Sequence, residues 1–205
     1  MKLYFSPGAC SLSPHIVLCE LGVPFEAVRV DLAAKRTADG KDFKSINPKG
    51  YVPALVTDEG QVLTEGPAVV QYLADRKPES GLAPANGTFE RYRVQEWLNY
   101  ISTEIHKSFS ALFNSALPDA GREIYFGKLE QRFGEIDAAL AGREYLMGAH
   151  FTVADAYLYT VLRWAGRFKI DLGRFANLSR YYARVDARPA VKAALEAEAA
   201  AKAAA

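Results

Sequence analysis

The fold of this chain is decided by its N-terminal stretch KLYFSPGACSLSP, residues 2–14. The apolar run Leu3–Phe5 has the composition of a strand, and Ser6-Pro7-Gly8 follows it with residues that favour a turn. Apolar residues then recur at helical spacing as far as Gly22, which ends the segment. The stretch therefore predicts a strand, a turn and a helix, with Cys10 at the start of that helix.

Cys10 is a candidate reactive thiol, because a helix N-terminus presents backbone N–H groups that favour a thiolate. This effect lowers a thiol pKa from about 8.5 by about one unit at most, so deeper activation needs a second cationic or donor group. The alternative is a small buried apolar residue, the commonest role of a free cysteine. The local sequence leaves both roles open for Cys10, whereas Cys19 in the middle of the helix better fits the buried one.

Composition narrows the class of protein. Half of the 205 residues are hydrophobic, and 25 lysines and arginines balance 24 acids, so no overall charge attracts nucleic acid or an anionic membrane. The two cysteines have neither a disulfide pattern nor a metal-ligand spacing, so we expect a reducing, cytoplasmic location and no metal. No signal peptide opens the chain and no run approaches the ~20 apolar residues of a membrane span, which predicts a soluble protein.

The order of expected elements divides the chain into two parts. The first eighty residues alternate strand-like and helix-like segments, which indicates an α/β fold, and the rest has helical spacing. Four prolines and glycines within residues 78–87 are typical of a linker. We expect an α/β domain over residues 1–80, a linker over 81–86 and an all-α domain over 87–205.

Within these domains, further strands are expected over residues 25–30, 53–56 and 61–64, and helices over 41–46, 67–76, 89–116, 122–140, 153–168, 177–187 and 189–197. The alanine-rich end, residues 199–205, has no large apolar side chain to pack. We expect it to fray.

Val52-Pro53 lies between a turn and a strand. A cis bond there would turn backbone groups of Val52 toward a bound peptide, although only about 5–6% of X-Pro bonds in folded proteins are cis. The alternative is an ordinary proline at the first position of an edge strand.

The segment Thr64-Glu65-Gly66-Pro67 predicts a helix start with Gly66 as N-cap, because proline suits the first helical position. A ligand carboxylate can dock on such a helix end, and Glu65 beside it can hold an ammonium group, so the pair is a candidate zwitterion site. The alternative for Glu65 is a solvent-exposed acid whose negative charge stabilises the N-terminus of the helix that follows it.

A polar stripe on the long helix contains Asn99, Thr103 and His106, spaced four and three residues apart on one side. A histidine there can hydrogen-bond a thiolate or donate to a substrate, and Lys107 adds a positive charge beside it. The alternative is a solvated helical face.

Thr152 and Asp155 match a capping box at the start of a helix, in which each side chain pairs with the backbone of the other. We expect a role in folding rather than in chemistry.

With these residues in place, the whole chain resembles the glutathione S-transferases, specifically the bacterial beta class. The match runs from residue 2 to about residue 195. Six segments carry it, in order: KLYFSPGACSLSPHIVL (2–18), INPKGYVPAL (46–55), LTEGPAVVQYLAD (63–75), ERYRVQEWLNYISTEIHK (90–107), FTVADAYL (151–158) and RPAVKAAL (188–195). The resemblance implies a thioredoxin-like N-terminal domain, a helical C-terminal domain and a homodimer with active sites at the subunit boundary.

The resemblance also implies roles for individual residues. Cys10 becomes the thiol that contacts glutathione, with Ser11 nearby, and His106 becomes its catalytic partner. Val52, before a cis Pro53, would pair with the cysteinyl part, and Glu65 with Gly66 would hold the γ-glutamyl end. The further residues assigned to the glutathione site are Lys35, Tyr51, Asn99, Thr103, Glu104 and Lys107, and those assigned to the hydrophobic substrate are Phe109, Phe113 and Trp164.

Three functional hypotheses follow. The first is conjugation of glutathione to small hydrophobic electrophiles, a detoxification activity that needs no metal. The second is thiol–disulfide exchange through Cys10, in a Cys-x-x-Ser arrangement. The third is a non-enzymatic regulator that keeps the fold and binds partners; the combination of Cys10, Glu65 and His106 argues against it.

Overall fold

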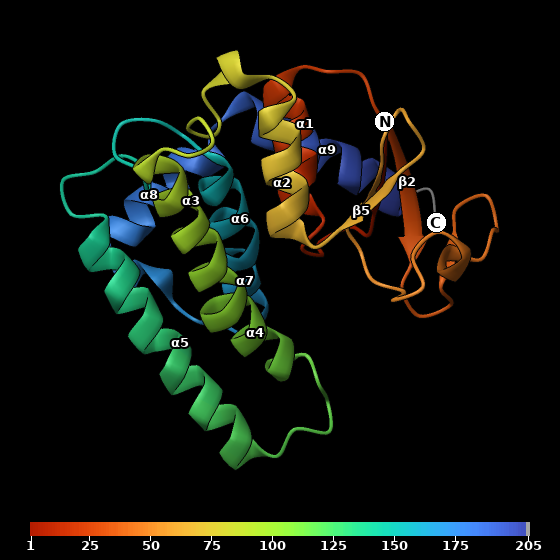
Figure 1. Cartoon of the computed structure of the whole chain (residues 1–205). Coiled ribbons are helices and arrows are strands. Elements are labelled where there is room, and N and C mark those ends of the chain that lie inside the picture. Colours follow the sequence, from red (N-terminus) through yellow and green to blue (C-terminus); the bar gives the residue numbers. More distant parts are fainter. Residues whose placement is uncertain (204–205) are drawn as a thin grey trace. The chain divides into compact units, whose positions relative to one another are not determined.

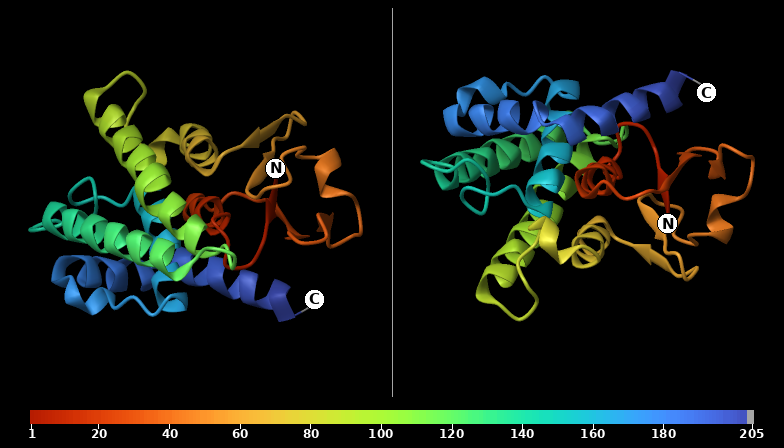
Figure 2. Two further views of the ribbon diagram at one scale, coloured as in Figure 1. Left: turned by 90° about the horizontal axis from the view of Figure 1, so that it is seen from below. Right: turned by 90° about the horizontal axis from the view of Figure 1, so that it is seen from above.

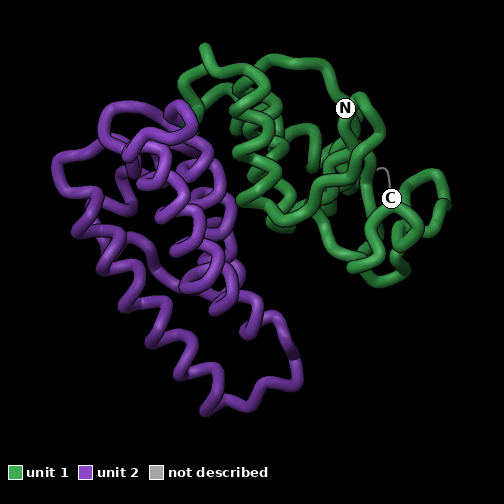
Figure 3. The backbone as a smooth tube through the Cα atoms, in the orientation of Figure 1, with its two compact units in different colours: residues 1–83, 187–205 green, residues 84–186 purple. Residues whose placement is uncertain are grey.

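The computed structural model describes residues 1–203, and the chain divides into two compact units (Figure 3). Unit 1 contains residues 1–83 and 187–205, and unit 2 contains residues 84–186. No helix within residues 1–203 has both the length and the apolar composition that crossing a bilayer requires.

Unit 1 is built on a five-stranded sheet with the order β3-β2-β1-β4-β5. Its strands are β1 (Lys2–Phe5), β2 (Glu26–Asp31), β3 (Arg36–Thr37), β4 (Ala54–Val56) and β5 (Val62–Thr64). β1 is parallel to β2 and antiparallel to β4, with Leu3 opposite both Ala27 and Leu55. A parallel pair needs a long crossover connection, and the helix predicted after residue 10 supplies it.

Three helices complete unit 1: α1 (Leu12–Leu21), α2 (Gly66–Asp75) and α9 (Pro189–Ala203), with short 3₁₀ turns at Phe43–Ser45 and Pro78–Ser80. α1 packs between α2 and α9 (Figures 1 and 2). Its apolar side chains, such as Ile16 and Leu18, are fully buried with Leu3 of β1. The predicted strand–turn–helix start is therefore confirmed and lies at the centre of the unit.

Unit 2 is all helical. It contains α3 (Phe89–Tyr100), a π-helical turn (Ile101–His106), α4 (Lys107–Leu112), α5 (Asp119–Ala139), α6 (Val153–Leu162), α7 (Trp164–Arg167), a 3₁₀ turn (Leu172–Arg174) and α8 (Ala176–Asp186). Every residue of α6 is buried, so this helix is the core of the unit. The thioredoxin-like sheet and the helical unit agree with the predicted fold class.

The start of α6 carries the capping box. The carboxylate of Asp155 accepts hydrogen bonds from the N–H of Thr152 at 2.8 Å and from the N–H of Leu146 at 2.9 Å. Asp155 is completely buried, and burial raises its pKa to about 6 although these hydrogen bonds act in the opposite direction. The side chain thus ties the loop before α6 to the first turn of the helix.

Several expected boundaries were wrong. The helix expected over 89–116 ends at Leu112 and changes to π geometry in its middle, and the helix expected over 153–168 is interrupted at Arg163. The two-residue strand β3 was not predicted.

The C-terminal helix is also longer than expected. It continues to Ala203 instead of fraying from residue 199, and residues 204–205 lie outside the described part. Polar contacts tie both ends of this segment to the rest of unit 1. Arg188 forms an ion pair with Glu20 of α1 (Nε to Oε1, 2.6 Å), and the buried Glu198 accepts a hydrogen bond from the N–H of Gly8 at 2.8 Å.

Candidate functional site

Cys10 lies in the loop between β1 and α1. Its side chain is half-buried, and Sγ donates a hydrogen bond to the carbonyl oxygen of Val52 at 3.3 Å. The Val52–Pro53 bond is cis, as the resemblance predicts. The thiol and the main chain of the segment before Pro53 therefore stand side by side.

The pKa of the Cys10 thiol is raised to about 11, mainly because burial penalises the charged form. The N–H groups of Cys10 and Ser11 favour the thiolate, but they offset only part of this effect, and the charge of Glu65 adds to the increase. The N–H groups of the helix start thus act in the expected direction, but burial outweighs them and the net pKa is raised. The sequence shows the helix start but not how little water reaches the sulfur.

The loop that carries Cys10 is held at two points. The hydroxyl of Ser11 is fully buried; it accepts from the N–H of Ser6 at 3.1 Å and donates to the carbonyl of Ser6 at 3.3 Å. Gly8 has a positive φ of 78°, a conformation that favours glycine, and its N–H donates a hydrogen bond to the carboxylate of Glu198. The side chain of Ser11 therefore serves the loop, and a ligand contact through its backbone stays a prediction.

Two predicted residues flank Val52. The side chain of Tyr51 is 68% exposed, and Lys35 places its ammonium group 5.6 Å from the centre of that ring. The same ammonium group donates to the carbonyl of Gly50 at 3.0 Å. Asn47, which the sequence did not single out, donates through Nδ2 to the carbonyl of Tyr51 at 2.7 Å and fixes the main chain there.

Glu65 has a backbone conformation that is rare for a residue with a side chain, with φ at 68°. Such strain is often found at functional sites. Glu65 precedes α2, so it stands at the N-cap position predicted for Gly66, which is instead the first helical residue. Its carboxylate is exposed and pairs with Lys49 at 2.9 Å. The sequence did not indicate Lys49, because only the folded β4–β5 region brings the two together.

In unit 2, His106 is the last residue of the π-helical turn, and such turns are frequent at functional sites. Its Nδ1 atom lies 2.6 Å from the hydroxyl oxygen of Tyr157 on α6. Its ring meets the Trp164 ring edge-on, with 5.0 Å between centres. No local pattern pointed to Tyr157, because α6 reaches α3 and the π-helical turn only through the tertiary fold.

The three residues predicted for the hydrophobic substrate form one aromatic cluster. Trp164 lies 5.7 Å from Phe109 and 5.4 Å from Phe113 between ring centres, and Phe168 stacks on Phe109 at 5.8 Å. Phe113 is 42% exposed, whereas Phe109 is fully buried. Phe113 is therefore the member that presents an apolar surface, and Phe109 supports it from beneath.

The remaining predicted residues lie along α3, the π-helical turn and the start of α4. Asn99 and Lys107 are exposed, and the hydroxyl of Thr103 donates to the carbonyl of Asn99 at 3.1 Å. Glu104 accepts from Nε of Arg132 at 2.9 Å, and this hydrogen bond is the main reason why its pKa is lowered. Glu104 is thus engaged with α5 within unit 2.

Comparison with protein families matches both parts of the chain. Residues 8–76 match the glutathione S-transferase N-terminal domain, and residues 100–189 match the glutathione S-transferase C-terminal domain. The chain belongs to the glutathione S-transferase family.

Relatives of full length agree. This glutathione S-transferase is 45% identical over 198 residues to the glutathione S-transferase GstA of Escherichia coli O157:H7, covering 97% of this chain and 98% of GstA. It resembles the solved structure of a sphingomonad glutathione S-transferase complexed with glutathione (47% identity, TM-score 0.94, 97% and 99% of the two chains). It also resembles the bacterial beta class enzyme of Sphingomonas chungbukensis (45% identity, TM-score 0.93, 97% and 98%), which confirms the predicted class.

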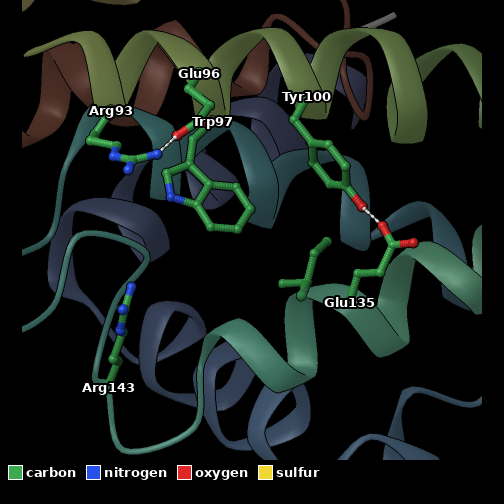
Figure 4. Close-up of a pocket in the computed structure, with 7 residues that line it drawn as sticks. Arg93, Glu96, Trp97, Tyr100, Glu135 and Arg143 are labelled. Carbon is green, nitrogen blue, oxygen red and sulfur yellow. Dashed lines mark hydrogen bonds and ion pairs between the residues drawn. The ribbon is translucent and has the colours of Figure 1, made fainter.

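The transferase also has a cavity of about 510 Å³ in unit 2 that contains none of the predicted site residues. Trp97 and Tyr100 of α3 lie opposite Glu135 of α5 (Figure 4), and Ile136 of α5 also lines the cavity. The hydroxyl of Tyr100 donates to Glu135 at 2.5 Å. Among residues 1–203, no group of three or more histidine, cysteine or acidic side chains is placed to hold a metal ion.

Proposed function

We propose that this protein transfers glutathione to small hydrophobic electrophiles. The observation that carries the proposal is the family membership, matched over residues 8–76 and 100–189, together with the contact of the Cys10 thiol with the main chain of Val52 in unit 1. The close sphingomonad relative was solved in complex with glutathione, which supports glutathione as the co-substrate. The same relatives do not favour the non-enzymatic alternative.

In unit 1, the tripeptide would lie along the main chain of Val52, with its cysteinyl part paired as an added strand. Its γ-glutamyl ammonium group would bind Glu65, and its carboxylate would meet the N–H groups at the start of α2 and the ammonium group of Lys49. Lys35 and Tyr51, which flank Val52, would supply further charge and contact area.

In unit 2, the electrophile would contact the exposed face of Phe113 and the edge of Trp164, because these rings offer a planar apolar surface. His106 adjoins this cluster, and we assign it the role of a hydrogen-bond donor to the reacting groups. Asn99, Thr103, Glu104 and Lys107 stay proposed contributors to the glutathione site.

The reaction is a substitution at carbon. For an aryl halide, the sulfur of glutathione forms a bond to the carbon that carries the halogen, the halide leaves with its bonding electrons, and the thiol proton goes to water. The enzyme lowers the barrier by holding the two reactants together. Cys10 need not be the nucleophile, because glutathione brings its own sulfur.

The direct test is turnover of glutathione with 1-chloro-2,4-dinitrobenzene by the folded protein. We expect conjugation that saturates with glutathione, and Glu65→Gln should raise the glutathione KM more than it lowers kcat. Arg174→Ala, which changes an exposed residue far along the chain, is the matched control. Absence of turnover at any glutathione concentration would reject the proposal.

A second candidate is thiol–disulfide exchange through Cys10, supported by the place of its sulfur beside the main chain of Val52, where the tripeptide is proposed to lie. In that reaction the Cys10 thiolate attacks one sulfur of oxidised glutathione and releases one glutathione thiolate. Mass spectrometry decides: a protein that never acquires one glutathionyl group on Cys10 does not use this route.

We further propose a homodimer in a reducing compartment such as the cytoplasm. The support is the resemblance to the family and the presence of two free cysteines, Cys10 and Cys19. Light scattering after size-exclusion chromatography should give twice the chain mass of 22.5 kDa. A monomer at micromolar concentration would contradict the dimer.

A further inference from the structure

The hydroxyl of Tyr157 and the imidazole of His106 form one hydrogen bond that the sequence does not reveal. Tyr157 is 2% exposed and projects from α6, the buried central helix of unit 2. The Oη to Nδ1 distance is 2.6 Å, and the two rings are inclined by 77°, so the hydroxyl points at the edge of the imidazole.

The length of this contact indicates which group donates. Hydrogen bonds from a hydroxyl commonly span about 2.5–3.0 Å, whereas those from an N–H group rarely fall below about 2.7 Å. A phenol is also a better donor than acceptor, because its oxygen lone pairs are delocalised into the ring. The 2.6 Å distance therefore favours the phenolic O–H as donor and Nδ1 of His106 as acceptor. A neutral imidazole that accepts at Nδ1 carries its hydrogen on Nε2.

The surroundings of His106 keep the ring in this orientation. Trp164 meets the imidazole edge-on with 5.0 Å between ring centres, so a flip of the ring would have to displace a nearly buried indole. The residue also sits at the end of the π-helical turn, where the hydroxyl of Ser110 donates to its carbonyl at 2.9 Å. Backbone and ring are thus fixed by different neighbours.

We propose that Tyr157 is a positioning residue that selects the Nε2–H tautomer of His106 and aims that N–H as the donor used in conjugation. The proposal rests on the proposed function, because it assigns Tyr157 an effect only through the donor role of His106. Tyr157 itself need not touch glutathione or the electrophile.

The tautomer can be read without any activity assay. The 205-residue chain contains three histidines, so ring signals in nitrogen-15 NMR at pH 8 are assigned to His106 by their loss in His106→Gln. We expect a protonated Nε2 and an unprotonated Nδ1 whose shift shows a hydrogen bond. In Tyr157→Phe the Nδ1 signal should move toward the position of an imidazole nitrogen without a donor. A protonated Nδ1 in the wild type, or an unchanged signal in the variant, would overturn the proposal.

Kinetics test whether the contact matters for turnover. Tyr157→Phe should lower kcat roughly 3- to 10-fold, the factor that one neutral hydrogen bond is worth, with little change in glutathione KM. In a His106→Gln background the same substitution should change kcat less than about 2-fold, because the partner is already gone. Tyr159→Phe on the same helix, whose hydroxyl bonds Asp186 instead, is the control and should leave the His106 signals and kcat unchanged.

The outcomes separate the two proposals. If the effects of Tyr157→Phe and His106→Gln simply multiply, Tyr157 acts through the fold and the positioning role is refuted. If conjugation is absent from the wild type, the proposed function fails, while the ring signals still decide the tautomer. If His106→Gln leaves kcat unchanged in an active enzyme, His106 is not the donor, and the positioning role fails while conjugation stands.

Discussion

The thiol of Cys10 should be unreactive at neutral pH. Its pKa is raised from 9.0 to about 11, first by burial and then by the negative charge of Glu65. Alkylating agents react with the thiolate, so the reaction rate follows the thiolate fraction. This fraction at pH 7 is about 10⁻⁴ for a pKa of 11 and about 10⁻² for the ordinary value, which makes alkylation of Cys10 about 100-fold slower than that of an unperturbed cysteine.

The assay is alkylation by iodoacetamide at pH 6 to 10, with Cys10 followed by mass spectrometry of its peptide. Cys19→Ser removes the second thiol, and the same protein in concentrated urea supplies the unperturbed reference. Restricted access alone would slow the reaction equally at every pH. A raised pKa instead makes the rate climb tenfold per pH unit throughout this range. A rate that levels off below about pH 9 would refute the reasoning.

Three further outcomes are expected. Thr152→Ala should lower the free energy of unfolding by about 0.5–2 kcal/mol in urea titrations, with unchanged turnover per folded molecule, because it weakens the cap of α6. The free energy of unfolding should fall by up to about 3 kcal/mol as pH rises from about 4 through 6. The reason is that Asp155 keeps its proton until about pH 6 in the folded protein but loses it near pH 4 in the unfolded chain. Asp155→Asn should flatten this dependence in unfolding measured at each pH. Glu65→Gln should increase the alkylation rate of Cys10 at pH 8, because a charge that raises the thiol pKa is removed; an unchanged rate would contradict this.

Much of the fold was predictable because local patterns and tertiary structure agree. The strand–turn–helix start and the helical second half follow from apolar spacing and from turn residues, which act over a few positions. The end of α9 was not predictable in the same way. An alanine-rich tail has little reason to stay helical alone, and it is the burial of Glu198 against Gly8, 190 residues away, that holds it.

The site shows the same division between local and distant causes. The resemblance placed the cis Val52-Pro53 bond correctly, because that feature belongs to one short motif. It did not reveal Lys49 beside Glu65 or Tyr157 beside His106, because each contact joins elements whose approach depends on the whole unit. The resemblance therefore named single residues, whereas their neighbours were seen only in the structure.

Cys10 shows that the pKa of a thiol cannot be predicted from nearby N–H groups alone, because the burial of the sulfur must also be known. The N–H groups at the mouth of α1 do favour the thiolate, but a helix end is worth about one pKa unit, and exclusion of water from a thiol can exceed that. Since the thiol also donates to the carbonyl of Val52, ionisation would place a negatively charged sulfur against the partial negative charge of that carbonyl oxygen. In the free protein, Cys10 therefore stays protonated and donates a hydrogen bond to the main chain along which glutathione is proposed to bind. Conjugation by the sulfur of glutathione then proceeds without competition from a second thiolate in the same place.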